Sequence, residues 1–403
     1  MAVKRFDRSR RVNSFISGRR RALCGLGCST AQTSLESIAW TPFGIRPSRT
    51  CAISRSTNRA SQLRKRRATP ACRSTGSSSW PRTKIRSARR GARWPRCRRP
   101  SRARIFTPTA AASIYAQRSR ETEFAPESII LGNGSNEIIE FIGHAFLRPG
   151  TELVTSENAF IAYRLVASLF GARAIEVADR EHRFDLDAIR QAITPQTRVV
   201  FIANPNNPTG TLVRQEAIDR FMARVPNDVV VVFDEAYFEY LDDPPDTLRF
   251  VRENRNVIVL RTFSKIHALA GVRLGYGIAA PGTHPGGAKT RAPFNTNGVA
   301  QAGARAALAD EAHQAESKRV TDEGRRYLEH EFAALGLPFV PSVANFVLVK
   351  VGDGKAVFKA LLQHGVIVRA LSGYKFPEWV RISVGTMEQN RKCIAALREV
   401  MAA

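Results

Sequence analysis

The sequence FIANPNNPTG at residues 201–210 joins an apolar run to a turn rich in asparagine and proline, and VVVVFDEAY at residues 229–237 follows the same pattern with an acidic turn. Segments with a helical period alternate with these runs, for example NEIIEFIGHAFL at residues 136–147. Short runs rich in Val and Ile that alternate with helices are typical of buried parallel strands. The sequence therefore predicts an α/β fold with a mostly parallel sheet.

The α/β pattern covers about 280 residues, which is more than one average domain contains. We expect a large domain at residues 123–310 and a smaller C-terminal α/β domain at residues 311–403. A helical segment at about residues 297–329 would connect them, because GLPFVPSVANFVLVKV at residues 336–351 begins a second strand-rich region. No apolar run reaches the roughly 18 to 20 residues of a membrane span, so we expect a soluble, cytoplasmic protein without a membrane partner.

The positive charge of the chain is concentrated at its N-terminal end. The whole sequence has 62 Lys and Arg against 35 Asp and Glu, a formal net charge of +27. Residues 1–120 contain 30 of the basic residues and 2 of the acidic ones, so the rest of the chain is almost neutral. Because this segment lacks a consistent apolar period and acidic partners, we expect residues 1–122 to be disordered.

The first candidate site is LGNGSNEIIEF at residues 131–141, where two glycines end a predicted strand and polar residues begin a helix. Free N–H groups and the helix dipole make such a turn suitable for binding phosphate. Ser135 and Asn136 are therefore candidate phosphate ligands. The alternative is an ordinary strand-to-helix turn capped by Ser or Asn.

Two further candidates lie at the carboxyl ends of predicted strands, where open α/β sheets bind their ligands. Asn207 lies in the rigid turn of the first quoted sequence, although turns of this composition are also common without a ligand. Asp234 ends the second apolar run, and Tyr237 follows it. A carboxylate in that position is costly to bury unless it meets a cation, a metal or hydrogen-bond donors. No metal-ligand cluster accompanies it, so no metal site is expected; the alternative is a solvated residue just beyond the strand.

The fourth candidate is RTFSKIHALAGVRLGYG at residues 261–277, which follows the apolar run NVIVL. It contains Ser264, Lys265 and Arg273. A lysine whose pKa is lowered by its environment can form a Schiff base. A lysine taken alone is more often a solvated surface charge, so this interpretation depends on the neighbouring motifs.

Together the four motifs supply the groups that a pyridoxal phosphate cofactor needs, namely a lysine for the imine, a carboxylate for the ring nitrogen, donors to the ring oxygen and a cationic phosphate site. Their order and spacing resemble the fold-type I pyridoxal phosphate-dependent aminotransferases of class I/II, most closely the histidinol-phosphate aminotransferase branch. The resemblance covers residues 125–403 and rests on NPNNPTG, VFDEAY, TFSKIHALAGVRLGYG and WVRISVGT.

The resemblance implies a role for each candidate residue. Lys265 would form the Schiff base with pyridoxal 5'-phosphate and move the proton between the α-carbon of the substrate and the cofactor, and Asp234 would keep the ring nitrogen protonated. Arg381, in EWVRISVGT, would clamp a substrate carboxylate or phosphate by a two-pronged contact, with an interdomain salt bridge as the alternative. The other cofactor ligands would be Asn207 and Tyr237 at the phenolic oxygen, Ser135, Asn136, Ser264 and Arg273 at the phosphate, and Phe160 stacked on the ring.

The resemblance also implies a reaction, ping-pong transamination between a small-molecule amino donor and an oxo-acid acceptor. Glutamate as donor and imidazole-acetol phosphate as acceptor would give 2-oxoglutarate and histidinol phosphate, a step of histidine biosynthesis. A homodimer is implied as well. Aromatic or other amino acids as substrates, and other pyridoxal phosphate chemistry such as decarboxylation, racemisation or β-elimination, stay open.

Two segments that this family normally has ahead of the phosphate site, resembling ASNENPLG and RYPDG, are absent from the sequence. Both are recovered if the last base of each codon is combined with the first two bases of the next. WPRTKIRSA at residues 80–88 then permits ASNENPLG, and FTPTAAASIYA at residues 106–116 permits YPDGGGFYLR. We hypothesise that residues 1–122 are mostly an out-of-frame translation, which would truncate the large domain and impair activity. A shift in the other sense permits a helix-forming sequence across residues 282–291, where Gly and Pro oppose a helix.

Two other interpretations of residues 1–122 compete with the altered frame. A composition rich in Arg and Ser and poor in acidic residues is typical of a transit peptide, but here the segment would displace motifs of the enzyme instead of preceding them. Its charge density would also bind nucleic acid through counterion release. The segment has no interleaved aromatic residues for stacking and no recognisable nucleic-acid module, so we expect no specific nucleic-acid partner.

Overall fold

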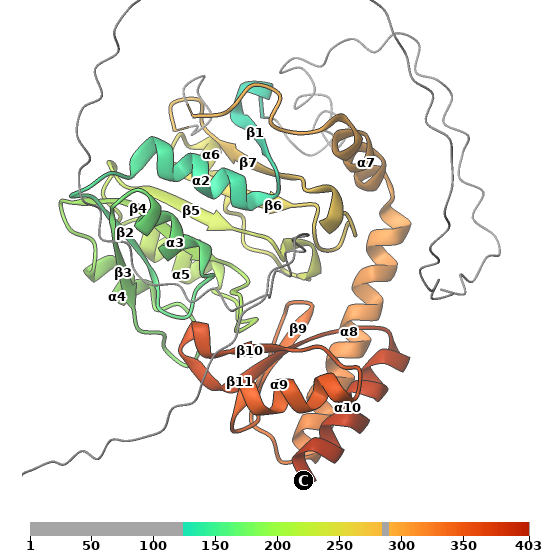
Figure 1. Ribbon diagram of the computed structural model, residues 1–403. Coiled ribbons are helices and arrows are strands. Elements are labelled where there is room, and N and C mark those ends of the chain that lie inside the picture. Colours follow the sequence, from blue (N-terminus) through green and yellow to red (C-terminus); the bar gives the residue numbers. More distant parts are fainter. Residues whose placement is uncertain (1–123, 284–289, 403) are drawn as a thin grey trace, which may run out of the picture. The chain divides into compact units, whose positions relative to one another are not determined.

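The structure, a computed structural model, describes residues 124–283 and 290–402 (Figure 1). All of these residues belong to the second of two units into which the chain divides, residues 93–403. The disorder and the altered frame expected for residues 1–122 lie outside the described residues, as does most of the segment where a second frame change was inferred. None of the described helices is both long and apolar enough to cross a membrane.

The larger sheet has seven strands in the order β1-β7-β6-β5-β4-β2-β3 (Figure 1). Strands β2 to β6 pair in parallel, whereas β7 is antiparallel to both of its neighbours, β1 and β6. The mostly parallel sheet predicted from the sequence is therefore confirmed. The strands are β1 (Ile129–Gly132), β2 (Glu152–Ser156), β3 (Arg173–Val177), β4 (Thr197–Ala203), β5 (Val230–Asp234), β6 (Val257–Thr262) and β7 (Gly275–Ala279).

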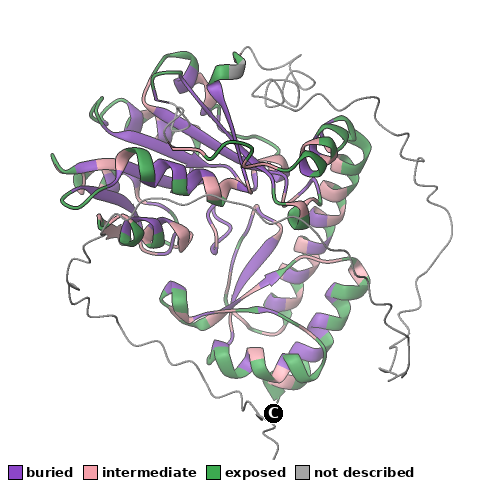
Figure 2. Ribbon diagram, turned by 45° about the horizontal axis from the view of Figure 1, so that its top comes forward, coloured by how far each residue is buried: buried purple, intermediate pink, exposed green. Residues whose placement is uncertain are grey.

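The central strands β4, β5 and β6 are almost entirely buried, as their apolar sequences predict (Figure 2). Valines pair with valines across them, Val199 with Val230 and Val231 with Val257. Helix α2 (Ser135–Phe146) adds its apolar stripe to the same core, while its opposite face exposes polar residues. The buried residues of that stripe are Ile138, Ile139, Phe141 and Ile142.

The remaining helices around this sheet are short, and polar side chains cap two of them. Asp185 accepts the N–H of Ala188 at 2.9 Å, and Asn297 accepts the N–H of Ala300 at 2.7 Å, which satisfies donors at the helix starts. The helices are α3 (Ala162–Leu169), α4 (Leu186–Gln191), α5 (Gln215–Met222), α6 (Leu248–Arg252) and α7 (Gly298–Ala309), with the single turns η1 (Pro126–Ser128), η2 (Phe238–Tyr240) and η3 (Ala270–Val272).

The C-terminal part forms a second sheet of four antiparallel strands in the order β10-β11-β9-β8. This smaller α/β region confirms the fold expected for the end of the chain, and it has a hydrophobic core of its own. Its elements are α8 (Glu311–Ala334), β8 (Phe339–Val340), β9 (Phe346–Lys350), α9 (Gly354–Gln363), β10 (Arg369–Leu371), η4 (Ser372–Tyr374), β11 (Phe376–Ser383) and α10 (Met387–Ala402).

The helical segment expected at residues 297–329 consists of two helices, α7 and α8, that meet at Asp310. The carboxylate of Asp310 accepts the N–H of His313 at 3.0 Å and so caps α8. The helical pattern of the sequence is continuous across this position, but the structure ends one helix at Ala309 and begins another at Glu311.

The topology brings four loops to one edge of the large sheet. Because β1, β4, β5 and β6 point in the same direction, their carboxyl ends share that edge. The loop after β1 leads into α2, and the loops after β4, β5 and β6 contain the other motifs found in the sequence. Open α/β sheets bind their ligands at such an edge.

Candidate active site

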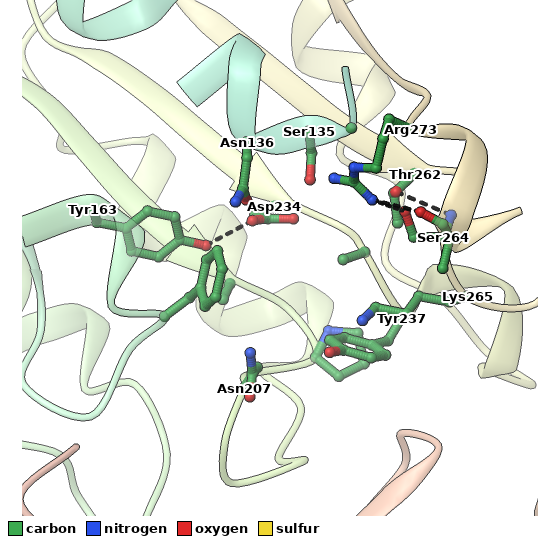
Figure 3. Close-up of a pocket in the computed structure, with 16 residues that line it drawn as sticks. Ser135, Asn136, Tyr163, Asn207, Asp234, Tyr237, Thr262, Ser264, Lys265 and Arg273 are labelled. Carbon is green, nitrogen blue, oxygen red and sulfur yellow. Dashed lines mark hydrogen bonds between the residues drawn. The ribbon is translucent and has the colours of Figure 1, made fainter. Parts of the chain in front are cut away.

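A pocket with a volume of about 260 Å³ lies where these loops meet (Figure 3). All nine residues that the sequence nominated as cofactor ligands line it, although they come from separate loops. These residues are Ser135, Asn136, Phe160, Asn207, Asp234, Tyr237, Ser264, Lys265 and Arg273. The other lining residues are Gly134, Tyr163, Ala203, Pro205, Ala236, Thr262 and Ala270.

One end of the pocket is formed by the start of α2 and by Arg273. Gly134 precedes the helix with a φ of 76°, and no side chain caps the N–H groups that begin at Ser135. Arg273 has a left-handed backbone with a φ of 60°. Its Nη1 donates to the carbonyl of Ala270 at 2.8 Å and lies 3.4 Å from Oγ of Ser264. Free N–H groups and a guanidinium thus meet at one place, an arrangement that binds phosphate.

Two glycines make room for this close approach. A Cβ atom at Gly134 would lie 2.5 Å from Nη2 of Arg273. A Cβ atom at Gly275 would lie 2.4 Å from the backbone nitrogen of Ser135. Either contact is too short to exist, so a larger residue would displace the guanidinium or the helix start. Because neither position has a side chain, Arg273 can lie against the first turn of α2.

Lys265 lies in the loop after β6, with its Nζ 5.1 Å from the centre of the Tyr237 ring. Burial lowers the pKa of the Lys265 amine, and the positive charge of Arg381 lowers it further. Asp234 opposes this shift, because its negative charge favours the protonated amine. At a given pH, more of Lys265 is therefore neutral and nucleophilic than of an exposed lysine.

Asp234 is the last residue of β5 and is buried beside the pocket. The hydroxyl of Tyr163 donates to its Oδ2 at 2.8 Å, whereas its Oδ1 has no hydrogen-bond partner among the described residues. Burial raises the pKa of this carboxyl group, and the hydrogen bonds from Tyr163 and from the backbone of Ala236 oppose the rise. A cationic donor in the pocket would satisfy Oδ1 and keep the carboxylate ionised.

Arg381 borders the pocket through Asn207 and is not one of its lining residues. Its Nη1 donates to Oδ1 of Asn207, and its guanidinium lies 4.8 Å from the centre of the Phe346 ring. Strand β11 holds it in register with Leu348 of β9. No carboxylate of the described residues forms an ion pair with Arg381, and its Nε has no partner there. The guanidinium is thus held next to the pocket with donors still available.

Glu235 and Arg261 form a buried ion pair that the sequence did not indicate. Nε and Nη2 of Arg261 lie 2.9 and 2.8 Å from Oε2 of Glu235, and Thr247 donates to the other carboxylate oxygen at 2.5 Å. The guanidinium also stacks on the ring of Phe238 at 3.6 Å. The pair joins the turn after β5 to the end of β6, so it lies directly after Asp234 and shortly before Lys265 in the sequence.

Two pocket residues with hydroxyl side chains, Tyr163 and Thr262, were also missed, although weak signals for both exist in the sequence. Tyr163 lies three residues after Phe160, which places both on one side of a helical turn. Thr262 is the second residue of the lysine motif at residues 261–277, and its Oγ1 accepts the N–H of Ser264 at 3.1 Å. Neither position has a distinctive local pattern, so only the fold brings them to the site.

Comparison with known proteins identifies relatives over most of the chain. It is 53% identical over 273 residues to the histidinol-phosphate aminotransferase of Akkermansia muciniphila, an alignment that covers 68% of this chain and 75% of that protein. It is 47% identical over 280 residues to the histidinol-phosphate aminotransferase of Moorella thermoacetica, which covers 68% and 72% of the two chains. The resemblance inferred from the motifs is thus confirmed.

Solved structures and a family model agree with these relatives. The crystal structure of histidinol-phosphate aminotransferase from Sinorhizobium meliloti in complex with pyridoxal-5'-phosphate matches with a TM-score of 0.69 and 29% identity, and covers 74% of this chain and 83% of that one. The family model described as aminotransferase class I and II matches residues 106–397. Since this match spans well over half of the sequence, the chain belongs to the class I and II aminotransferase family.

Proposed function

We propose that the chain is a pyridoxal phosphate-dependent aminotransferase that transfers the amino group of glutamate to imidazole-acetol phosphate, which yields 2-oxoglutarate and histidinol phosphate. The observation on which the proposal mainly rests is the pocket where Lys265, the unpartnered Oδ1 of Asp234 and the cationic start of α2 meet. The relatives named as histidinol-phosphate aminotransferases support the choice of substrates.

The groups around the pocket fit pyridoxal 5'-phosphate. When bound, this cofactor supplies an electron sink that stabilises negative charge on the α-carbon of the substrate. Oδ1 of Asp234 is free to accept from its ring nitrogen, and Arg273 with the start of α2 can hold its phosphate. Phe160 borders the pocket as a stacking surface, and Asn207 and Tyr237 as donors to the ring oxygen.

Lys265 is proposed as the catalytic residue. Its lowered pKa makes neutral Nζ available, which can bind the cofactor covalently when no substrate is present. With an amino donor bound, the same nitrogen can take the proton from the α-carbon of the donor. Both tasks need an amine that is buried beside the pocket and only partly protonated, and burial together with the charge of Arg381 favours that state.

Arg381 is proposed to recognise a carboxylate or phosphate of the substrate. Its Nη1 donates to the neutral amide oxygen of Asn207, while Nε is buried without a partner among the described residues. An anionic substrate would offer a charged, bidentate acceptor in place of this single neutral one, which is the stronger contact for a guanidinium.

Further parts of the proposal concern organisation. We propose a homodimer in the cytoplasm, a large domain at residues 123–310 and a small domain at residues 311–403. Separate hydrophobic clusters in the two sheets support the division. We also propose that activity of this chain is impaired, which is supported by the absence of segments resembling ASNENPLG and RYPDG from its sequence.

The proposed activity is tested with purified chain, pyridoxal 5'-phosphate and glutamate. We expect the absorption band of the lysine imine, and 2-oxoglutarate should exceed one equivalent per enzyme only when imidazole-acetol phosphate is also present. Lys265→Ala should lose the band and the turnover, whereas Lys359→Ala, at an exposed position of α9, should keep both. Turnover should be lower than in a chain whose frame has been repaired across residues 1–122.

Carbon dioxide or an elimination product from the amino donor, without 2-oxoglutarate, would show that the chain has another pyridoxal phosphate chemistry. Absence of the imine band in the unsubstituted chain would contradict the cofactor assignment itself. A chain that binds the cofactor and transaminates only aromatic donors would support the proposed type of reaction and contradict the proposed substrates.

A further inference from the structure

Tyr163 is a fully buried tyrosine between the pocket and the large sheet. It is the second residue of α3, and its ring stacks on Phe201 of β4 with the centroids 4.4 Å apart and an interplanar angle of 12°. Phe160 meets the same ring edge to face, at 5.8 Å and 86°. These two contacts hold the phenol in one orientation, with its hydroxyl at the end of β5 (Figure 3).

The hydroxyl of Tyr163 and the carboxylate of Asp234 form a hydrogen bond that is shielded from water. The distance from the hydroxyl to Oδ2 is 2.8 Å. Burial and the negative charge of Asp234 raise the pKa of Tyr163 well above its ordinary value, so the hydroxyl keeps its proton and is the donor. Oδ1 of the same carboxylate is buried and has no partner among the described residues. The chain thus occupies one oxygen and leaves the other for a ligand.

We propose that Tyr163 is a positioning residue, which holds Oδ2 of Asp234 so that Oδ1 meets the protonated ring nitrogen of the cofactor. This inference rests on the proposed function, since it requires pyridoxal 5'-phosphate in the pocket. Tyr163 acts only through Asp234. Without its hydroxyl, Oδ2 would lose the side-chain donor that fixes it, and the carboxylate could turn about its Cβ–Cγ bond.

The hydrogen bond also affects the charge of Asp234. Burial raises the pKa of this carboxyl group, whereas Tyr163, the N–H of Ala236 and the amine of Lys265 lower it. These groups approach from α3, from the turn after β5 and from the loop after β6, and the phenol of Tyr237 lies close enough to be affected by the same charge. Loss of the Tyr163 hydroxyl would raise the pKa of Asp234 further, so less carboxylate would be available to bind a cationic nitrogen as the pH falls.

The test is Tyr163→Phe in the full chain, because phenylalanine keeps both ring contacts and removes only the hydroxyl. The Kd for pyridoxal 5'-phosphate, measured by absorbance titration, should rise about tenfold, as expected for a lost hydrogen bond to a charged group. The acid limb of the affinity profile should move to higher pH. Tyr327→Phe, which removes a hydroxyl from a partly buried ring of α8, is the matched control and should bind like the unsubstituted chain.

A cofactor analogue with carbon in place of the ring nitrogen separates positioning from general damage to the site. It should bind the unsubstituted chain and Tyr163→Phe equally. Asp234→Asn, which cannot ionise, provides a second variant, and adding Tyr163→Phe to it should no longer move the acid limb of the profile.

Two results for Tyr163→Phe would overturn the positioning role and leave the proposed function intact. One is an equal loss of affinity for the cofactor and the analogue, and the other is an unchanged Kd and pH profile for the cofactor. An acid limb that still moves when Tyr163→Phe is added to Asp234→Asn would also overturn the positioning role. An unsubstituted chain that does not bind pyridoxal 5'-phosphate would refute both proposals together.

Discussion

Nη2 of Arg261 lies 2.8 Å from Oε2 of Glu235 in an ion pair whose side chains are only 7% and 2% exposed. Glu235 directly follows Asp234, the last residue of β5, and Arg261 lies near the end of the neighbouring parallel strand β6, which leads into the Lys265 loop. Removal of one member leaves the other charge buried without a counter-ion, which is far more destabilising than loss of an exposed pair.

Arg261→Met should therefore lower the free energy of unfolding by about 3 to 5 kcal/mol, measured by urea denaturation. Replacing Glu235 with Met as well should recover much of the loss, because no lone charge is then buried. Arg319→Met, which breaks exposed ion pairs with Glu316 and Glu323 on α8, serves as control and should change stability little. If Arg261→Met were no less stable than this control, the buried ion pair would not contribute to the free energy of unfolding.

The reactivity of Lys265 should depend on pH in a way that Arg381 controls. As the pH rises through the lowered pKa of Lys265, the neutral amine increases, so the rate of covalent cofactor binding should rise and then level off. Arg381→Leu removes a positive charge that lowers this pKa, and the midpoint should therefore move to higher pH. Stopped-flow absorbance across a pH series measures it.

Arg369→Leu is the matched control for that experiment, because Arg369 is the exposed partner of Arg381 in the β10–β11 pairing and does not contribute to the shift at Lys265. It should leave the midpoint unchanged. A midpoint that stays fixed or moves to lower pH in Arg381→Leu would show that Arg381 does not act on the amine.

Gly134→Ala should weaken cofactor binding through its phosphate. The new Cβ atom would lie 2.5 Å from Nη2 of Arg273 and would displace the guanidinium. We expect a Kd for pyridoxal 5'-phosphate at least about tenfold higher, since a charge-assisted contact is lost. Pyridoxal without phosphate should bind almost as before.

Gly150→Ala controls for backbone strain, because Gly150 has a similar positive φ of 86° but nothing within 4 Å of the added Cβ atom. It should lower stability without changing the Kd. Equal effects of the two substitutions on cofactor binding would assign the defect at Gly134 to strain and not to the displaced Arg273.

The nucleotide sequence across codons 75–125 should show an altered reading frame. The shifted frame is expected to encode ASNENPLG within codons 80–88 and YPDGGGFYLR within codons 106–116, without a stop. Genomic reads from a homogeneous sample are the measurement. Stop codons in the shifted frame between codons 80 and 116 would eliminate the hypothesis.

The residues that line the pocket could be predicted to lie together because strand ends are local features of the sequence. Asp234, Asn207 and Lys265 each follow an apolar run, and the carboxyl ends of parallel strands necessarily meet at one edge of a sheet. The number of residues that separates them along the sequence does not matter, since the order and direction of the strands bring them together.

Tyr163 and Arg261 could not be found in the same way. Their function depends on which side chain faces them in the folded interior, and a tyrosine in a helix or an arginine at a strand end is not unusual locally. The start of α8 at Asp310 is a different case, because Asp at a helix start is a recognisable cap that the periodic pattern on both sides concealed.

The antiparallel strand β7 lies between β1 and β6, and within the described sheet it is the only strand that pairs with β1. During synthesis, Ile129–Gly132 leave the ribosome long before Gly275–Ala279 have been made. The apolar first strand must therefore wait for a distant segment, and pairings of this kind form slowly. A nascent chain that stops short of β7 would present an unpaired apolar edge to chaperones, and its cofactor site would lack both the anchored start of α2 and the Gly275 contact that shapes it.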